Sequence, residues 1–148
     1  KVSKSGINAS LGVITLVGLA SVMAHAGMTS MLARGLSESI SRTFYPAVAP
    51  LIGALGAFIT GSNNNSNILF AMMQMDAAVL LKLPVPIILA AQSAGGSIGS
   101  VMSPGKVIVG CSTVGLTGRE GEAMRWIMLL GLIPILVIAI LATILALG

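Results

Sequence analysis

The sequence has few charged residues, few aromatic residues and one cysteine. Of its 148 residues, 8% are charged and 3% are aromatic, whereas 55% are hydrophobic. Because soluble domains carry about 25% charged residues, this composition excludes an ordinary soluble protein and predicts an integral membrane protein in a lipid bilayer. The single cysteine, Cys111, excludes an intrachain disulfide and a zinc-type cysteine cluster. We expect neither a metal nor a cofactor.

The charged residues lie in small groups with long uncharged stretches between them. Only Asp76 interrupts an apolar segment, and Lys106 stands alone. The formal net charge is +4, but no cluster of Lys and Arg is interleaved with aromatic residues, as a nucleic-acid surface would require. The basic residues therefore indicate topology determinants beside membrane segments, and we expect no nucleic-acid partner. No nucleophile-elbow or HExxH pattern points to an enzyme.

The apolar runs predict an all-α integral membrane fold, with residues 1–148 as one transmembrane transport region. The expected segments are spans at about 11–32 and 126–148, an interfacial helix at about 35–45, a hairpin at about 46–81 and a broken helix at about 84–117. The interfacial helix is predicted from Leu36, Ile40 and Phe44, which recur every four residues, and Tyr45 is expected at headgroup level.

A polar stretch at 60–67 separates two apolar arms, Pro46–Thr60 and Ile68–Leu81. The first arm would be only about 22 Å long as a helix, whereas a hydrocarbon core is roughly 30 Å thick. Short arms around a polar tip predict a re-entrant hairpin with a non-helical turn buried in protein or in a wet cavity. A simple loop between two spans is the alternative. Ser66 or Asn67 is expected to cap the second arm.

The segment that follows the hairpin is too long and too interrupted for one ordinary span. The run at 92–100 is rich in serine and glycine, which are poor helix formers. Ser103 followed by Pro104 provides an N-cap residue and a proline suited to the first helical position. These features predict a discontinuous helix. The alternative is a continuous helix whose glycines form a packing face.

These motifs resemble the L-lactate permease family of bacterial carboxylate transporters. The resemblance is carried by MAHAGMTSMLA at 23–33, TGSNNNSNILF at 60–70, AAQSAGGSIGSVMSP at 90–104 and VGCSTVGLTGREGE at 109–122. His25 stands where the family is expected to have another residue. Family members are much longer, so the resemblance implies a C-terminal fragment whose partner is the missing N-terminal part of the same permease. It also implies proton-linked uptake of L-lactate, and often glycolate, by a multi-pass protein of the bacterial inner membrane.

The family fold implied is built from inverted repeats, each with a hairpin and a broken helix. If the hairpin tip meets the broken helix near the midplane, two helix N-termini converge there, and their free N–H groups suit a small carboxylate. The expected substrate-binding residues are Ser62, Asn63, Asn65, Ser66, Asn67, Gln92, Ser93, Gly95, Gly96 and Ser103. Neutral amides and hydroxyls would pair with the solute, and the glycines would let backbone approach it.

Three charged or titratable residues are candidates for proton or charge coupling. His25 is either a proton carrier or a neutral histidine bonded to a neighbouring helix. Asp76 is either a cation or proton site or a residue close enough to the end of its arm to reach water. Lys106 opposes the dipole of its helix, so it requires a bound anion or a wet vestibule. A carrier of another anion such as a dicarboxylate, Na⁺ coupling, and a non-transporting subunit or channel remain open alternatives.

Overall fold

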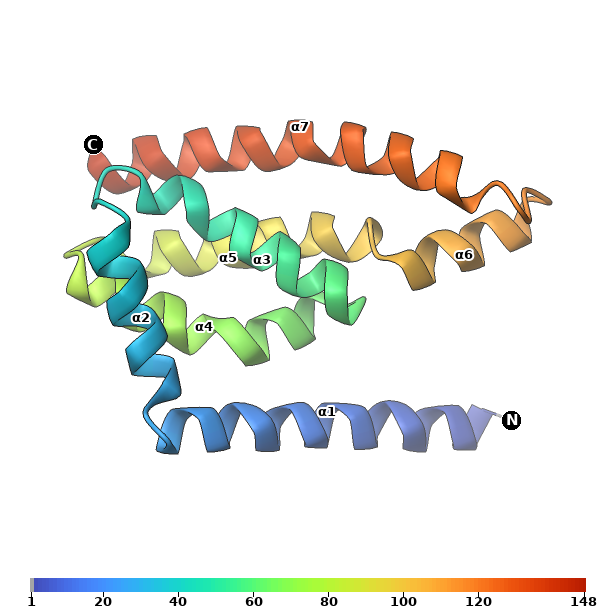
Figure 1. The fold of residues 1–148 in the computed structure, drawn as a ribbon, viewed down its shortest axis with the longest axis horizontal. Helices are drawn as coiled ribbons and strands as arrows, with labels where there is room; N and C mark the ends of the chain where they lie inside the picture. Colours follow the sequence, from blue (N-terminus) through green and yellow to red (C-terminus); the bar gives the residue numbers. More distant parts are fainter. Residues whose placement is uncertain (1) are drawn as a thin grey trace.

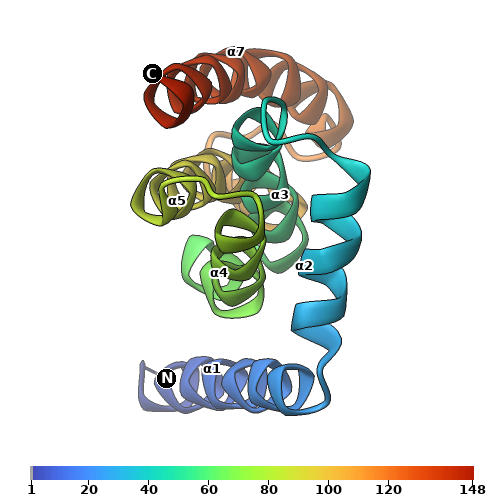
Figure 2. The same cartoon turned by 90° about the vertical axis from the view of Figure 1, so that its left-hand side faces the viewer.

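The computed structural model describes residues 2–148, with side chains from Ser10 onward, and the described chain is entirely helical. Its helices are α1 (Val2–His25), α2 (Met28–Ser39), α3 (Tyr45–Thr60), α4 (Asn63–Leu80), α5 (Val85–Val101), α6 (Pro104–Thr113) and α7 (Glu120–Leu147). Helices α3, α4 and α5 form the centre, and α7 lies along one side of it (Figure 1). Helix α1 lies on the opposite side, and α2 crosses the space between α1 and the start of α3 (Figure 2).

The first expected span, 11–32, is bent. Helix α1 ends at His25, and α2 leaves it at 69°. The bend occurs because Gly27 adopts φ 74°, a left-handed conformation that glycine accepts without steric cost. The amide of Gly27 donates to the carbonyl of Ala24 to close the turn. The span predicted at about 11–32 is therefore not one straight helix, although the bent pair together is long and apolar enough to cross a membrane.

The expected interfacial helix at 35–45 does not form either. Helix α2 ends at Ser39, and α3 begins at Tyr45. Leu36 and Ile40 are partly buried and pack against the hydrophobic core. Tyr45 is expected at headgroup level but is fully buried. Its hydroxyl donates to Gln74 inside the helix bundle, so burial leaves no polar atom of the side chain unpaired.

Only two residues, Gly61 and Ser62, separate α3 from α4 in the hairpin. Gly61 ends α3 with φ 72°, and Ser62 then caps α4 by accepting from the amide of Asn65. The predicted non-helical tip is therefore mostly helix, and neither Ser66 nor Asn67 is the cap. Helix α4 begins at Asn63 because the Ser62 side chain satisfies one of the first unpaired N–H groups.

The broken helix bends by 43° between α5 and α6, after the glycine-rich run rather than within it. Residues 92–100 are helical because their glycines pack against α3, as in the packing-face alternative. Helix α6 restarts at Ser103 and Pro104. The Ser103 hydroxyl donates back to the carbonyl of Ser100, so it occupies the N-cap position without capping the helix.

Helices α3 and α5 cross at backbone contact distance. A Cβ atom added at Gly95 would overlap the carbonyl oxygen of Pro50, and one added at Gly99 would overlap that of Ala54. From the other side, a Cβ at Gly53 would overlap the carbonyl oxygen of Gln92. Larger residues in this seam would separate the two helices, so the glycines set how closely the hairpin lies on α5.

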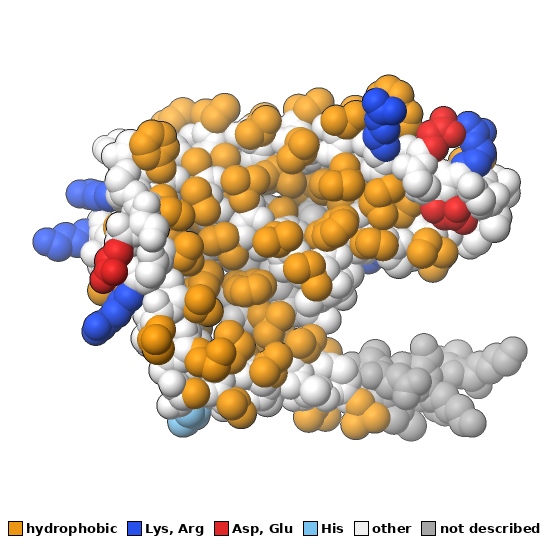
Figure 3. Space-filling view, in the orientation of Figure 1, with side chains coloured by type: hydrophobic (Ala, Val, Ile, Leu, Met, Phe, Trp, Pro, Cys, Tyr) orange, Lys and Arg blue, Asp and Glu red, His pale blue; other side chains and the backbone are white. Residues whose placement is uncertain are grey.

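Helix α7 is the only helix of the described chain that is by itself long and apolar enough to cross a membrane. Up to three such crossings result if each bent pair, Ser10–His25 with Met28–Ser39 and Val85–Val101 with Pro104–Thr113, is counted as one span. Hydrophobic side chains cover much of the visible face, and the charged ones gather toward its two ends (Figure 3). This distribution agrees with an apolar band between two polar boundaries.

The seam predicts a clear stability difference between two Gly→Ala variants. Gly95→Ala should destabilise the protein by about 1–3 kcal/mol, because overpacking must push α3 away from α5. Gly110→Ala on α6 is the matched control, because its added Cβ has no atom within 4 Å. Thermal unfolding in detergent should show a lower midpoint for the first variant only. Equal midpoints would show that the two helices do not touch there.

Candidate functional site

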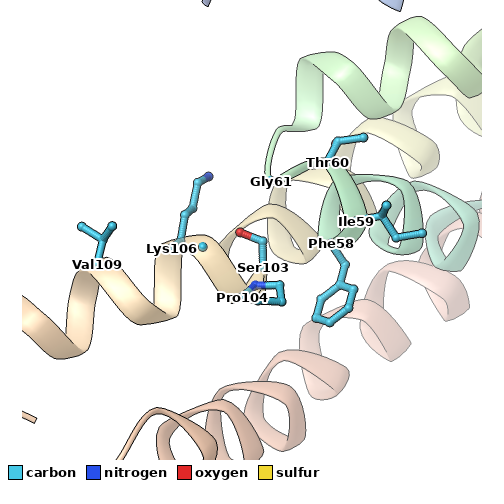
Figure 4. Close-up of a pocket in the computed structure, with 9 residues that line it drawn as sticks. Phe58, Ile59, Thr60, Gly61, Ser103, Pro104, Lys106 and Val109 are labelled. Carbon is cyan, nitrogen blue, oxygen red and sulfur yellow. The ribbon is translucent and has the colours of Figure 1, made fainter. Parts of the chain in front are cut away.

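The hairpin turn lies beside the bend of the broken helix. A Cβ added at Gly61 would be 3.7 Å from the hydroxyl oxygen of Ser103. The two segments enclose an open cleft of about 560 Å³, shown in Figure 4. Its lining residues are Phe58, Ile59, Thr60, Gly61, Ser103, Pro104, Gly105, Lys106 and Val109. The end of α3 and the start of α6 therefore share one open space.

Next to this turn, the first residues of α4 form hydrogen bonds with α5. The side-chain amide nitrogen of Asn63 donates to the hydroxyl of Ser97 at 3.0 Å and to that of Ser93 at 3.4 Å. The amide nitrogen of Asn67 donates to Ser93 at 3.1 Å. Asn63 and Asn67 are one helical turn apart, as are Ser93 and Ser97, so the two pairs face each other across α4 and α5.

Both asparagines are left with one unpaired buried atom. The carbonyl oxygens Oδ1 of Asn63 and Asn67 are buried and have no hydrogen-bond partner. A buried acceptor without a donor costs about 1–3 kcal/mol, so these oxygens favour a ligand or water that supplies one. The side chain of Asn63 also lies against Gly96, where any Cβ would overlap its Oδ1. Gly96 therefore makes room for the asparagine rather than for the solute.

Behind these residues, a fully paired polar network crosses the core. Tyr45 donates to Gln74 (2.7 Å), Gln74 donates to Gln92 (2.9 Å) and Gln92 donates to Ser66 (3.2 Å). Ser66 in turn donates to the carbonyl of Gly53 at 2.8 Å. All four side chains are fully buried. Gln92 and Ser66, expected to bind substrate, instead tie α4 and α5 to α3.

The remaining predicted residues divide between structural and peripheral positions. Gly95 packs on the backbone of α3 and does not face open space. Ser62 caps α4, and Asn65 is partly buried in its first turn. Ser103 is 2% exposed and lines the cleft beside Gly61. Of the neutral candidates, Asn63 and Asn67 thus carry the unpaired polar atoms, and both donate to Ser93.

Only one of the three charged candidates joins this region. His25 is exposed at the end of α1, where its Nδ1 lies 2.8 Å from the backbone oxygen of Ser21. Asp76 faces α2, where it accepts from the hydroxyl of Ser30 at 3.4 Å and shares a separate cleft with Arg34. Lys106 lines the cleft at the hairpin turn and donates to Ser100 at 3.1 Å.

Four residues of the polar site and its supporting network were not predicted from the sequence: Tyr45, Gln74, Ser97 and Ser100. Gln74 could have been noticed as a polar residue within an apolar arm. The serines at 93, 97, 100 and 103 recur every three or four residues, a helical pattern that is visible only if the glycine-rich run is read as helix.

The buried network predicts that Tyr45→Phe destabilises the protein although it removes only one oxygen. The substitution leaves Oε1 of Gln74 without the tyrosine donor in a buried position, which costs about 1–3 kcal/mol. Thr143→Val is the control, because it removes a hydroxyl that bonds only within its own helix. We expect a lower thermal midpoint in detergent for Tyr45→Phe alone. An unchanged midpoint would mean that the network adds nothing to stability.

The sequence of this chain matches the profile of the L-lactate permease family over residues 2–147. It is 32% identical to an L-lactate permease of Bacillus subtilis over 131 residues, which cover 88% of this chain and 23% of that permease. It is 33% identical to an L-lactate permease of Salmonella typhi over 135 residues, covering 90% and 24%. A glycolate permease of Escherichia coli is 33% identical over 116 residues, covering 78% and 20%. No solved structure matches the chain.

The chain thus spans about a quarter of the length of the curated relatives that it matches. Its helical fold, its apolar surface and the profile match over nearly its whole length agree with one another. The chain belongs to the L-lactate permease family, a family of membrane transporters rather than enzymes.

Proposed function

We propose that this chain is part of a secondary transporter that carries a small monocarboxylate, L-lactate or glycolate, with a proton across the bacterial inner membrane. The observation that supports this best is the meeting of the hairpin turn with the bend of the broken helix, beside unpaired polar atoms. Discontinuous helices of this kind are where secondary transporters bind solutes and ions. The names of the relatives supply the choice of lactate and glycolate.

The hairpin is proposed to be re-entrant, with its turn inside the bilayer. Helix α3 has 16 residues, or about 24 Å, and α4 has 18, or about 27 Å, whereas the hydrocarbon core is roughly 30 Å thick. Neither arm reaches across on its own. A polar turn at this depth requires protein or water around it, and the cleft beside Lys106 provides such a place.

The second half of the site is proposed to come from a part of the permease outside this chain, which covers about a quarter of its relatives. Asn63, Asn67 and Ser93 offer polar groups on one side only. Alternating access requires two halves of a transporter to move around a central site. An inverted repeat with its own hairpin would supply the missing side.

Asp76 is the proposed proton carrier of this half, because its carboxylate is partly buried and lies apart from the cleft. Its hydrogen-bond partner is the hydroxyl of Ser30 on α2, and Arg34 of the same helix lines the cleft that it shares. Because Ser30 lies on α2 and Asp76 on α4, a proton taken up by Asp76 would act on the contact between these two helices. His25 has no such position, since it is exposed at the end of α1.

The function predicts proton-driven uptake of lactate by the complete gene product in proteoliposomes. An inwardly directed proton gradient should accumulate labelled lactate, a protonophore should abolish accumulation, and excess glycolate should compete. Replacing Na⁺ by K⁺ should change nothing. Accumulation that requires Na⁺, or inhibition by succinate but not by glycolate, would instead favour the Na⁺-coupled or dicarboxylate alternative. Flux without lactate counterflow would indicate a channel.

The site assignment predicts that Asn63→Ala and Asn67→Ala impair uptake far more than Asn64→Ala. Asn64 is the matched control, because it lies on the same turn but is exposed. Losing one polar partner of a buried solute costs about 1–3 kcal/mol, or roughly tenfold in affinity. Initial uptake rates should be divided by the amount of inserted protein. Normal uptake kinetics in both variants would reduce the asparagines to a structural role.

A further inference from the structure

Lys106 occupies a position that its own helix disfavours. It is the third residue of α6, after Pro104 and Gly105. The N-terminal end of a helix carries a partial positive charge, so a cation in the first turn is repelled unless an anion lies nearby. The sequence offers no acidic residue in that turn. Lys106 is exposed, so this repulsion is offset either by water or by an anion from elsewhere in the fold or from a ligand.

The described part of the protein provides no such anion. Among residues 10–148, the ion pair found is Arg119 with Glu122, at the start of α7. The other described carboxylates belong to Glu38 on α2, Asp76 facing α2, and Glu120 in the first turn of α7. The ammonium of Lys106 instead donates to a neutral hydroxyl, that of Ser100, at 3.1 Å. An ammonium has three hydrogens, so two remain for a ligand.

The space in front of Lys106 fits a small organic anion. Figure 4 shows Lys106 extending from the first turn of α6 close to Ser103, with Thr60 and Gly61 of the hairpin across from them. Phe58, Ile59 and Val109 add apolar walls to the cleft of about 560 Å³. A compact group with one negative charge and a short hydrocarbon part matches one cation beside apolar walls. A second carboxylate would find no second cation among the described lining residues.

We infer that Lys106 binds the carboxylate of the transported solute, in a subsite between the hairpin turn and the start of α6. This inference rests on the proposed transport function and names the group that recognises the charge. Asn63 and Asn67 bond to the neutral hydroxyls of Ser93 and Ser97, whereas the charge of Lys106 distinguishes an anion from a neutral molecule of the same shape. The other described cations are on α2, in the connections at either end of the bundle and on α7, away from the hairpin turn.

The test compares Lys106→Gln, Lys106→Arg and Lys82→Gln in the complete gene product, reconstituted in proteoliposomes. Lys82→Gln is the matched control, because Lys82 is an exposed lysine in the α4–α5 connection. Labelled L-lactate uptake gives KM and Vmax, and inhibition by lactate is compared with inhibition by lactamide, its neutral amide. Thermal midpoints are measured with and without lactate.

We expect Lys106→Gln to raise KM for lactate at least tenfold and to reduce the preference for lactate over lactamide by a similar factor. Its thermal midpoint without ligand should be no lower than that of the wild type, because the first turn of α6 disfavours a cation, while the increase caused by lactate should disappear. Lys106→Arg should keep part of the preference, and Lys82→Gln all of it. The ratio of the inhibition constants for lactate and lactamide does not depend on the amount of inserted protein. It therefore tests the subsite even if Lys106→Gln inserts poorly.

Two results separate this inference from the proposed function. Wild-type uptake of lactate together with an unchanged KM and an unchanged inhibitor ratio in Lys106→Gln would overturn the subsite and leave transport standing. Absence of lactate uptake, together with stabilisation by carboxylates that depends on Lys106, would overturn lactate transport and support the subsite. Reduced insertion with an unchanged inhibitor ratio in the protein that does insert would show that Lys106 only directs topology, and the subsite would again be wrong.

Discussion

The hairpin and the broken helix meet at a seam where the backbones of α3 and α5 are in direct contact. Gly53 on α3 and Gly95 and Gly99 on α5 leave no room for a Cβ, so each helix fits against the carbonyl groups of the other. Such a seam has little freedom, because a shift by one residue would bring a side chain into it. The position of the hairpin turn beside the bend at Ser103 follows from this register.

Polar groups then divide into a paired set and an unpaired set. Within a membrane, a buried polar group has no water to replace a missing partner, so pairing is the normal state. The network from Tyr45 through Gln74 and Gln92 to Ser66 meets this requirement and tightens the seam. The carbonyl oxygens of Asn63 and Asn67 do not meet it. Both sets use α4 and α5, with Ser66 of the network directly preceding Asn67 in the chain, so the paired residues support the helices that carry the unpaired oxygens.

The sequence predicted elements whose cause is local and missed those whose cause is a neighbouring helix. Composition, the apolar run of α7 and the Ser103–Pro104 restart are local signals, and each has its counterpart in the described helices. The glycine-rich run was expected to interrupt its helix because glycine is a poor helix former alone. Its role in the seam depends on α3. The prediction that Gln92 binds substrate fails in the same way, because its hydrogen-bond partners, Gln74 and Ser66, lie on another helix and are not visible from the local sequence.

The two polar regions of the site lie on opposite sides of a joint. Asn63 reaches Ser97 on α5, before the bend, whereas Lys106 belongs to α6, after it. The ammonium of Lys106 bonds to Ser100 across the bend, and this is a single hydrogen bond between neutral and charged partners. A ligand can shift a conformational equilibrium only by binding its two states unequally. An anion that takes the two remaining hydrogens of the ammonium would join α6 to the hairpin turn while Ser100 keeps its bond across the bend, so its binding energy depends on the angle between α5 and α6.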